Sequence, residues 1–260
     1  MKYVRYSGKD NIPTYGILEG EQIRRISGDL FGAYSVTDEY VAAAAVKLLP
    51  PCVPSKIVCV GVNYLSHILE AQQGLDPTAK IPKEPALFLK RVNCAAGIGD
   101  AIEYPTGVKR LDYEGEFTVV IGKKCKRVSA EESLEYVLGY TCGNDVSARD
   151  WQLGDPQWYR GKGLDGFAPF GPVISDEADP DNSYVRSYLN GKLVQDGNTN
   201  DLNFGVRALV SFISQWITLE AGDIIMTGTP SGVGPMHPGD VVEIEVENVG
   251  RLVNYIVGKE

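Results

Sequence analysis

The sequence is short of histidine and of positive charge. It has two histidines among 260 residues, and its 25 lysines and arginines are outnumbered by 34 acidic residues, which gives a formal net charge of −9. So few histidines argue against metal sites built from several imidazole ligands. An acidic chain is a poor electrostatic match for a phosphate backbone, so we expect no nucleic-acid partner. Such a chain also repels anionic small molecules at long range, and it needs a local positive centre to bind one.

Long apolar runs and paired cysteines are also missing. No stretch approaches the roughly 20 apolar residues that span a bilayer, and the N-terminus has no apolar segment typical of a secretory signal, so we expect neither a membrane partner nor export. The five cysteines are widely spaced and form no C-x-x-C pair. This pattern argues against a disulfide framework or a zinc site, and it predicts reduced thiols in a cytoplasmic protein.

The pattern of apolar residues, glycines and prolines indicates an α+β fold that is mainly β. Short apolar or alternating runs, separated by 29 glycines and 15 prolines, are typical of strands and turns. Regular alternation of strands and helices is absent, which argues against a doubly wound sheet or a (β/α)8 barrel. We predict helices at residues 41–49, 64–73, 130–137 and 205–215. The last of these places five apolar residues on one stripe: Val206, Leu209, Val210, Ile213 and Trp216.

Three prolines mark the best linker of the chain. Pro50, Pro51 and Pro54 lie close together, after a run that reads as short strands and before an apolar strand. They predict a small β-rich N-terminal region at residues 1–54 and a larger domain at residues 55–260.

Two acidic residues occupy alternate positions of a predicted strand. Glu114 and Glu116 would point to the same face, because side chains of a strand alternate with a period of two. Together they would suit a hard cation, but a solvated strand edge explains the same pattern. The run of Glu243, Glu245 and Glu247 has the same spacing and is expected to be merely solvated. Spacing alone therefore leaves both readings open.

Asp145 and a His67–Glu70 pair are further candidates. Asp145 follows a predicted buried strand, where it would be a third oxygen ligand or a cap of the following turn. His67 and Glu70 are three positions apart on a predicted helix and are therefore neighbours. A carboxylate beside an imidazole raises its basicity, which suits a general base, although an incidental surface ion pair gives the same pattern. His237 lies between two prolines and is expected in a turn.

Two glycine-rich loops complete the candidates. The loop at residues 227–234 lacks the Gly-Lys-Ser/Thr ending of a P-loop and the G-x-G-x-x-G of a dinucleotide site. Its backbone N–H groups and the Thr229 hydroxyl would suit a substrate carboxylate, or the loop is only a connector. Lys162 stands between two glycines. It would supply positive charge to an anionic substrate, or it is simply exposed to solvent.

The order of these segments and the residues within them resemble those of the fumarylacetoacetate hydrolase family. The match runs from about Ile57 to Val257, and the chain looks most like the short bacterial branch, described as acylpyruvate hydrolases and 2-hydroxyhepta-2,4-diene-1,7-dioate isomerases. The N-terminal residues resemble the small leading region of that branch more weakly. The motifs that carry the resemblance are Asn63-Tyr64-x-x-His67-x-x-Glu70, Asp112-Tyr-Glu114-x-Glu116, Asn144-Asp145-x-Ser-Ala-Arg149-Asp150-x-Gln152, Gly161-Lys162-x-x-Asp165-x-Phe-x-Pro-x-Gly-Pro172 and Gly222-Asp223-x-Ile-x-Thr-Gly-Thr229-Pro-x-Gly-Val-Gly234.

The resemblance implies a mixed β-roll catalytic domain that holds a divalent cation. The cation is usually Mg²⁺, with Mn²⁺ or Ca²⁺ as substitutes. Glu114, Glu116 and Asp145 match the three metal ligands of the family, and His67 and Glu70 match a catalytic dyad on a short helix that acts as a lid. The resemblance also implies a homodimer.

Four further positions match family residues that approach the substrate, a small anionic 2-oxo acid. Lys162 matches a catalytic residue, and the substrate-binding matches are Arg149, Gln152 and Thr229. The implied function is Mg²⁺-dependent hydrolysis of the C–C bond of an acylpyruvate-type 1,3-dioxo acid, through an enolate on the metal and with water activated by the dyad.

Other reactions in the family use the same residues, so they stay open as alternatives. They are isomerisation or decarboxylation of 2-hydroxyhepta-2,4-dienedioate-type intermediates, and oxaloacetate decarboxylation or tautomerisation. Selectivity among them would depend on pocket walls, for which residues 72–83 and 151–159 are the candidates.

Overall fold

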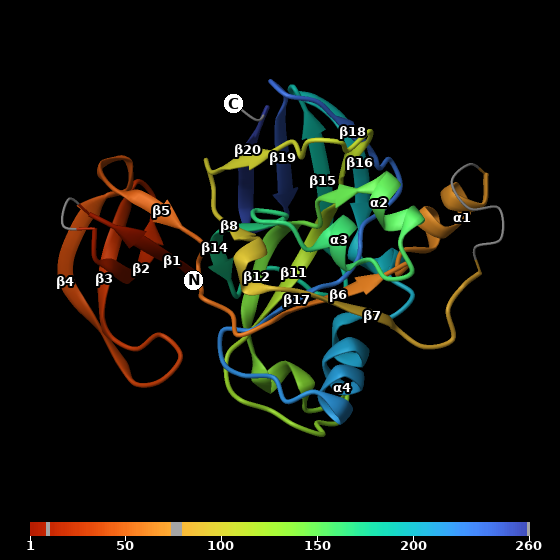
Figure 1. Cartoon of the computed structure of the whole chain (residues 1–260). Coiled ribbons are helices and arrows are strands. Elements are labelled where there is room, and N and C mark those ends of the chain that lie inside the picture. Colours follow the sequence, from red (N-terminus) through yellow and green to blue (C-terminus); the bar gives the residue numbers. More distant parts are fainter. Residues whose placement is uncertain (9–10, 74–79, 259–260) are drawn as a thin grey trace.

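The computed structural model describes residues 1–8, 11–73 and 80–258 and is mainly β, as the sequence predicts (Figure 1). Its largest sheet has the strand order β4-β3-β2-β1-β14-β12-β11-β17-β6-β7, with β5 paired to β1 and β8 paired to β14. A second sheet has the order β16-β15-β19-β20-β9, and three short strands, β13-β10-β18, form a third.

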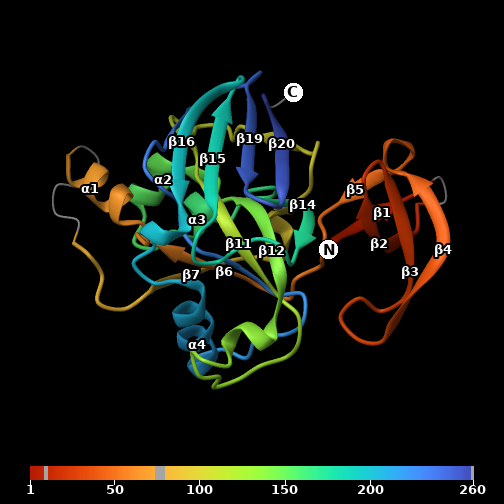
Figure 2. The same ribbon diagram turned by 180° about the vertical axis from the view of Figure 1, so that it is seen from behind.

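The N-terminal strands form a lobe beside the rest of the molecule, as Figures 1 and 2 show from opposite sides. Antiparallel pairing of β1 with β14, through Lys2 with Ser175 and Tyr3 with Ile174, makes this lobe continuous with the large sheet. Its strands are β1 (Lys2–Ser7), β2 (Pro13–Glu19), β3 (Gln22–Gly28), β4 (Tyr34–Ala42) and β5 (Lys47–Leu49).

The helix predicted at residues 41–49 is wrong. The segment contains the end of β4, a single 3-10 turn at Ala43–Ala45, and β5. Its alanines favour a helix, but an isolated helix of this length is marginal. Pairing of Val41 with Ile23 and of Leu48 with Tyr6 decides the structure instead.

The remaining strands build the part that carries the predicted chemistry. The central ones are β6 (Ile57–Gly61), β7 (Ala86–Lys90), β11 (Gly115–Ile121), β12 (Val137–Asn144), β14 (Ala168–Ser175) and β17 (Ile224–Met226). The second sheet consists of β9 (Ala101–Glu103), β15 (Tyr184–Leu189), β16 (Lys192–Asn198), β19 (Val241–Val246) and β20 (Gly250–Val257). Short strands are β8 (Ala95–Ala96), β10 (Leu111–Tyr113), β13 (Ser147–Ala148) and β18 (Gly234–Met236).

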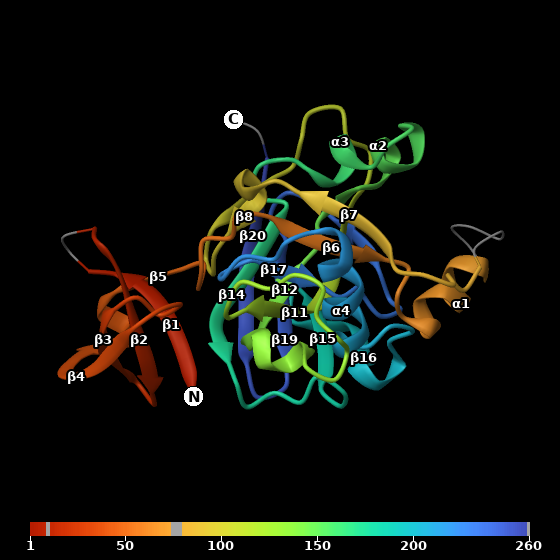
Figure 3. The same ribbon diagram turned by 90° about the horizontal axis from the view of Figure 1, so that it is seen from below.

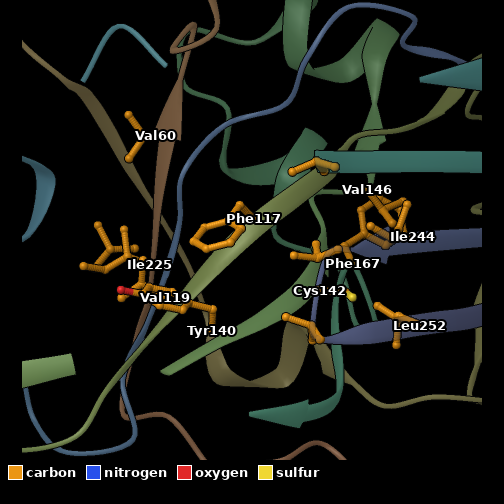
Figure 4. Close-up of a cluster of buried hydrophobic side chains, with 14 of the residues drawn as sticks. Val60, Phe117, Val119, Tyr140, Cys142, Val146, Phe167, Ile225, Ile244 and Leu252 are labelled. Atoms are coloured by element: carbon orange, nitrogen blue, oxygen red, sulfur yellow. The ribbon is translucent and has the colours of Figure 1, made fainter. Parts of the chain in front are cut away.

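The hydrophobic core lies between the large sheet and the second sheet. Every residue of β11 is buried, because β12 and β17 flank it and both of its faces are covered. Figure 4 shows Phe117 and Val119 of β11 in this core together with Ile244 and Leu252 of the second sheet. The Phe117 ring lies 4.8 Å from the ring centroid of Tyr140. A strand fixed so firmly is a rigid support for polar groups at its end.

Helices are few and short: α1 (Leu65–Gln73), α2 (Arg149–Gly154), α3 (Tyr159–Lys162) and α4 (Val206–Trp216). The helices predicted at residues 64–73 and 205–215 are therefore confirmed. At residues 130–137 only a 3-10 turn forms, at Ser133–Tyr136, because Val137 already belongs to β12. The apolar stripe of α4 is buried except for Trp216, which is 73% exposed. Trp216 lies at the edge of the stripe, about 70° from its centre at ~100° per residue.

Four smaller expectations concern membrane-spanning helices, the cysteines, the glutamates near β19 and His237. None of the described helices is long and apolar enough to cross a bilayer. All five cysteines are free and buried. The expectation that Glu243, Glu245 and Glu247 are merely solvated is wrong, because all three are half-buried. Glu243 and Glu245, on the outer face of β19, pair with Arg251, and Glu247 accepts the backbone N–H of Tyr184 at 3.3 Å. His237 is exposed in a turn, as predicted.

Candidate active site

Three buried carboxylates converge at the start of β11. Glu114 precedes this strand and Glu116 lies in it, while Asp145 follows β12. Because β11 and β12 pair with Gly115 opposite Asn144, the end of one strand lies beside the start of the other. One carboxylate oxygen from each acid lies within 4.8 Å of the others. The three residues are 6%, 1% and 2% exposed, so the solvated-edge reading of Glu114 and Glu116 is wrong.

Asp145 does not act as a helix cap. The nearest helix, α2, begins after Ala148 without a side-chain cap. The Asp145 carboxylate instead accepts a hydrogen bond from Lys162 Nζ at 2.6 Å, and its other oxygen lies 2.5 Å from Lys90 Nζ. The side-chain oxygen of Asn144 accepts the backbone N–H of Glu114 at 2.9 Å, which fixes the first carboxylate to the end of β12.

Buried cations surround the acidic cluster. Lys162, which is 3% exposed, also donates to Glu114 Oε2 at 2.8 Å, so the reading of Lys162 as a solvent-exposed residue is wrong. Arg149 bonds to Glu114 and, at 2.9 Å, to the buried Asp112. Lys90 lies behind Asp145 and donates to the backbone oxygens of Val146 and Phe167.

The carboxylates differ in their affinity for protons. Burial alone would raise the pKa of Glu114, but the charges of Lys162 and Arg149 outweigh it and hold that pKa well below its ordinary value. Burial and the charge of Asp145 raise the pKa of Glu116 well above its ordinary value. Glu116 accepts the backbone N–H of Gly228 at 2.7 Å, and no ion pair joins it to any lysine or arginine among the described residues.

This donor set fits a hard divalent cation. Its three members are carboxylates, the ligand type that Mg²⁺, Mn²⁺ and Ca²⁺ prefer. They are buried and held in place by paired strands. At Glu116 the negative charge has no lysine or arginine partner among the described residues. The same three residues are the ligands that the sequence predicts.

His67 and Glu70 lie together on α1 at the edge of this cluster. His67 Nδ1 is 3.5 Å from Glu70 Oε2, which is longer than a normal hydrogen bond. The Glu70 carboxylate accepts the backbone N–H of Gly232 at 3.0 and 3.1 Å. The start of α1 is fixed by Asp201, which accepts the backbone N–H of Ser66 at 3.0 Å. Contacts with Asp201 and Gly232 therefore hold α1 in place close to both members of the His67–Glu70 pair.

The Thr229 hydroxyl and the backbone of the loop at residues 227–234 form hydrogen bonds with other groups of the protein. The Thr229 hydroxyl donates to the Gly115 backbone oxygen and accepts from Gln195, both at 2.8 Å. The N–H groups of Gly228 and Gly232 are used by Glu116 and Glu70. The expectation that these amides are free for a substrate carboxylate is therefore wrong for two of them, because they position acidic side chains.

One cavity of about 110 Å³ unites most of the predicted residues. Such a volume is well below the roughly 300–1,000 Å³ of sites for drug-sized ligands, so it suits a small molecule. The remaining walls are formed by Val60, Gly61, Val62, Phe88 and Trp158. Seven of the nine predicted site residues line it: His67, Glu114, Glu116, Arg149, Gln152, Lys162 and Thr229.

The two segments expected to form pocket walls, residues 72–83 and 151–159, differ in what the structure shows of them. Gln152 and Trp158, from residues 151–159, line the cavity. Within residues 72–83, positions 74–79 lie outside the described residues. Sequence reasoning missed Lys90 and assigned no role to Asp112. The signal for Lys90 was available, since a single charge ends the apolar run Ala86–Leu89.

Comparison with known proteins places the chain among enzymes of related chemistry. The family model "Fumarylacetoacetate (FAA) hydrolase C-terminal" matches residues 56–257, and "Rv2993c-like, N-terminal" matches residues 1–51. Protein Rv2993c of Mycobacterium tuberculosis is 42% identical over 269 residues, covering 100% of this chain and 99% of that protein. The human mitochondrial oxaloacetate tautomerase FAHD2A is 39% identical over 222 residues, covering 81% of this chain and 69% of that protein.

A solved structure agrees over the whole length. The 2-hydroxyhepta-2,4-diene-1,7-dioate isomerase from Mycobacterium marinum superposes with a TM-score of 0.91 at 39% identity, covering 100% of this chain and 99% of that one.

Proposed function

This chain belongs to the fumarylacetoacetate hydrolase family, and on that premise we propose that it hydrolyses the C–C bond of small acylpyruvates with the help of a divalent cation. The observation that carries the proposal is the buried carboxylate cluster beside the His67–Glu70 pair, opening into one small cavity. A 1,3-dioxo acid needs both features, because an enolate must leave and a water molecule must be activated.

Glu114, Glu116 and Asp145 would hold the cation, which we take to be Mg²⁺, with Mn²⁺ or Ca²⁺ as substitutes. When bound, it supplies the positive charge that stabilises a developing enolate oxygen.

Charge balance explains how an acidic protein accepts an anionic substrate. Four buried carboxylates, those of the three ligands and of Asp112, face four cations: the buried Lys90, Arg149 and Lys162, and the half-buried Arg110, which also pairs with Asp112. Counted as ionised groups, they sum to 0, which offers a 2-oxo acid no net attraction. A divalent cation would change this sum to +2. The local positive centre that the net charge of −9 demands would then be supplied beside the cavity.

His67 would act as the general base. Its Nδ1 faces Glu70, so a proton on Nδ1 points at that carboxylate and Nε2 stays free to take a proton from water. The separation of 3.5 Å closes with a small rotation of either side chain, and catalytic hydrogen bonds are often long in ligand-free structures. The hydroxide so formed attacks the distal carbonyl of the dioxo acid. Collapse of the tetrahedral adduct breaks the C–C bond to the pyruvate unit, which gives a carboxylic acid and the enolate of pyruvate, and the enolate takes the proton back from His67 at carbon.

Lys162 and Gln152 would stabilise the tetrahedral oxyanion. Burial would lower the pKa of Lys162, but Asp145 and Glu114 outweigh it and raise that pKa, so the side chain is an ammonium ion. The side-chain oxygen of Gln152 accepts from Arg149 at 2.7 Å. This leaves the Gln152 NH₂ group as a donor toward the cavity. Two donors beside the reacting carbonyl are the arrangement that an oxyanion requires.

A second candidate is proton transfer without C–C cleavage. It is favoured by the similarity to oxaloacetate tautomerase FAHD2A and to the mycobacterial isomerase. His67 and Glu70 would then only move a proton between carbon and oxygen, and decarboxylation would use the same groups.

The deciding experiment is a substrate panel with Mg²⁺ present. Acetylpyruvate cleavage is followed by loss of diketone absorbance, and oxaloacetate is followed both for pyruvate formation and for the enol-to-keto rate. We expect acetylpyruvate to be cleaved, and His67→Ala to abolish the cleavage. Acceleration of oxaloacetate tautomerisation alone would replace the first candidate by the second. The homodimer and the cytoplasmic location stay predictions.

A further inference from the structure

A groove of about 590 Å³ runs along β7 beside the candidate active site. The strand β7 is the last in the order of the large sheet, so one of its edges has no partner strand among the described residues. The groove, called the side groove below, is lined by Ala86–Leu89 of this strand and by Pro156–Tyr159 of the segment that leads into α3. Figure 3 shows α3 next to β7.

Two aromatic rings separate the side groove from the catalytic cavity. Phe88 and Trp158 line both hollows. Their ring centroids are 5.3 Å apart at an interplanar angle of 77°, an edge-to-face pair. The catalytic Lys162 lies on the cavity side of this wall, with Nζ 5.3 Å from the Phe88 ring centroid. A substrate that fills the cavity therefore meets the wall directly beside its reacting end.

The position of Trp158 is set by its surroundings. Arg160 forms two bonds to Asp155 at 2.6 and 2.7 Å and stacks over the Trp151 ring at 4.8 Å, which fixes the segment on both sides of Trp158. On the cavity side the ring lies over Gly61. A Cβ atom at Gly61 would be 2.9 Å from Trp158 Cζ3, so any larger residue there must displace the ring.

The lining of the side groove carries no charged residue. Its members are mostly apolar or aromatic, and Leu89 is half exposed. Arg91 lies outside this lining and donates to the hydroxyl of the lining residue Tyr159 at 3.3 Å. Burial of methylene groups in such a groove is favourable, whereas an ionised carboxylate would lose hydration without gaining a partner within the lining.

We propose that rotation of the Trp158 ring opens this wall and lets the uncharged acyl chain of the substrate enter the side groove, so that Trp158 sets the accepted chain length. This inference rests on the proposed function for the identity of the reacting end. It assigns a substrate class, namely acylpyruvates with an unbranched alkyl chain and no second carboxylate.

The test compares acylpyruvates of increasing length with the Mg²⁺-loaded enzyme. Acetyl-, butyryl- and hexanoylpyruvate are compared with succinylpyruvate, which carries a carboxylate at a similar length. We expect kcat/KM to rise about two- to fourfold per methylene, the upper figure corresponding to full burial of each group. Succinylpyruvate should be cleaved at least tenfold less efficiently than butyrylpyruvate.

Variants distinguish the groove from the rest of the surface. Leu89→Asp should remove the gain with chain length and leave acetylpyruvate cleavage unchanged. Leu153→Asp is the matched control, since Leu153 is an exposed leucine on α2 that does not line the groove, and it should change nothing. Gly61→Ala should shift the Trp158 ring and alter the preferred length. A flat chain-length profile in the wild type, or equal effects of Leu89→Asp and Leu153→Asp, overturns the proposal.

A binding experiment separates this inference from the proposed function. Pyruvate, 2-oxobutanoate, 2-oxohexanoate and 2-oxooctanoate are titrated into the Mg²⁺-loaded protein by calorimetry. If affinity rises with length and Leu89→Asp cancels the rise, the subsite stands even if no acylpyruvate is cleaved. If acetylpyruvate is cleaved but affinity does not depend on length, the proposed function stands and the subsite is refuted.

Discussion

Lys90 provides the sharpest test of the charge balance at the site. Its ammonium group is buried, lies 2.5 Å from Asp145 Oδ1, and donates to two backbone oxygens. Lys90→Met keeps most of the side-chain volume but removes the charge and the donors. The Asp145 carboxylate then keeps only Lys162 as an ionic partner.

The expected loss is large because the pair is buried. Removing one partner of a buried ion pair typically costs about 3–5 kcal/mol, since the other charge stays in a poorly solvated place. For a chain of this size, that corresponds to a fall of roughly 6–20 °C in the unfolding temperature. An exposed pair contributes far less, so Lys47→Met, which breaks the exposed pair with Asp100, should change little.

The assay is urea or thermal unfolding with and without Mg²⁺. Because a divalent cation held by the cluster would neutralise Asp145 in place of Lys90, Mg²⁺ should stabilise Lys90→Met more than it stabilises the wild type at equal saturation. A loss below about 1 kcal/mol in Lys90→Met, or the same Mg²⁺ effect in both proteins, would show that Lys90 does not compensate the acidic cluster.

Three further predictions concern the dyad, the ligands and the thiols. His67→Ala should lower acylpyruvate turnover by about 10²-fold or more while Mg²⁺ affinity, measured by calorimetry, stays unchanged; full retained activity would contradict the dyad assignment. Glu116→Gln should abolish Mg²⁺ binding and activity together. The control Glu243→Gln, on the outer face of β19, should alter neither. Normal turnover of an EDTA-treated wild type would refute the metal requirement. Burial raises the pKa of Cys142 to about 12 and raises that of the other four thiols. Because the thiolate is the reactive form, Ellman's reagent at pH 8 should find no fast thiol in the folded protein and five after unfolding, and a fast thiol before unfolding would contradict the burial.

The two glutamate runs show what the sequence can and cannot predict. Glu114 with Glu116 and Glu243 with Glu245 have the same spacing on strands, yet the first pair is buried in the site and the second pairs with Arg251 on a surface. The difference arises from neighbours that are distant in sequence, because β12 and the loop at residues 227–234 enclose only the first pair. Local periodicity fixes the direction of a side chain, but not what covers it.

The motifs brought together residues that local periodicity could not connect. Nine positions were assigned from the resemblance, and seven of them line one cavity. Lys90 was missed because it carries no motif of its own, and its importance appears only when β7 is placed behind Asp145. The helix at residues 41–49 failed for a related reason, since strand pairing in the N-terminal lobe overrides the local preference of alanine.

The loop at residues 227–234 links the two halves of the proposed chemistry. Its Gly228 N–H donates to the proposed ligand Glu116, and four residues later its Gly232 N–H donates to Glu70 of the proposed dyad. Both glycines have positive φ, of 103° and 94°, and a Cβ atom would lie 2.9 Å from Asn63 at the first and 2.1 Å from the Val194 backbone oxygen at the second. The backbone can take this path only with glycine at both positions. A displacement of the loop would therefore move Glu116 and Glu70 together, which couples the position of α1 to that of the acidic cluster.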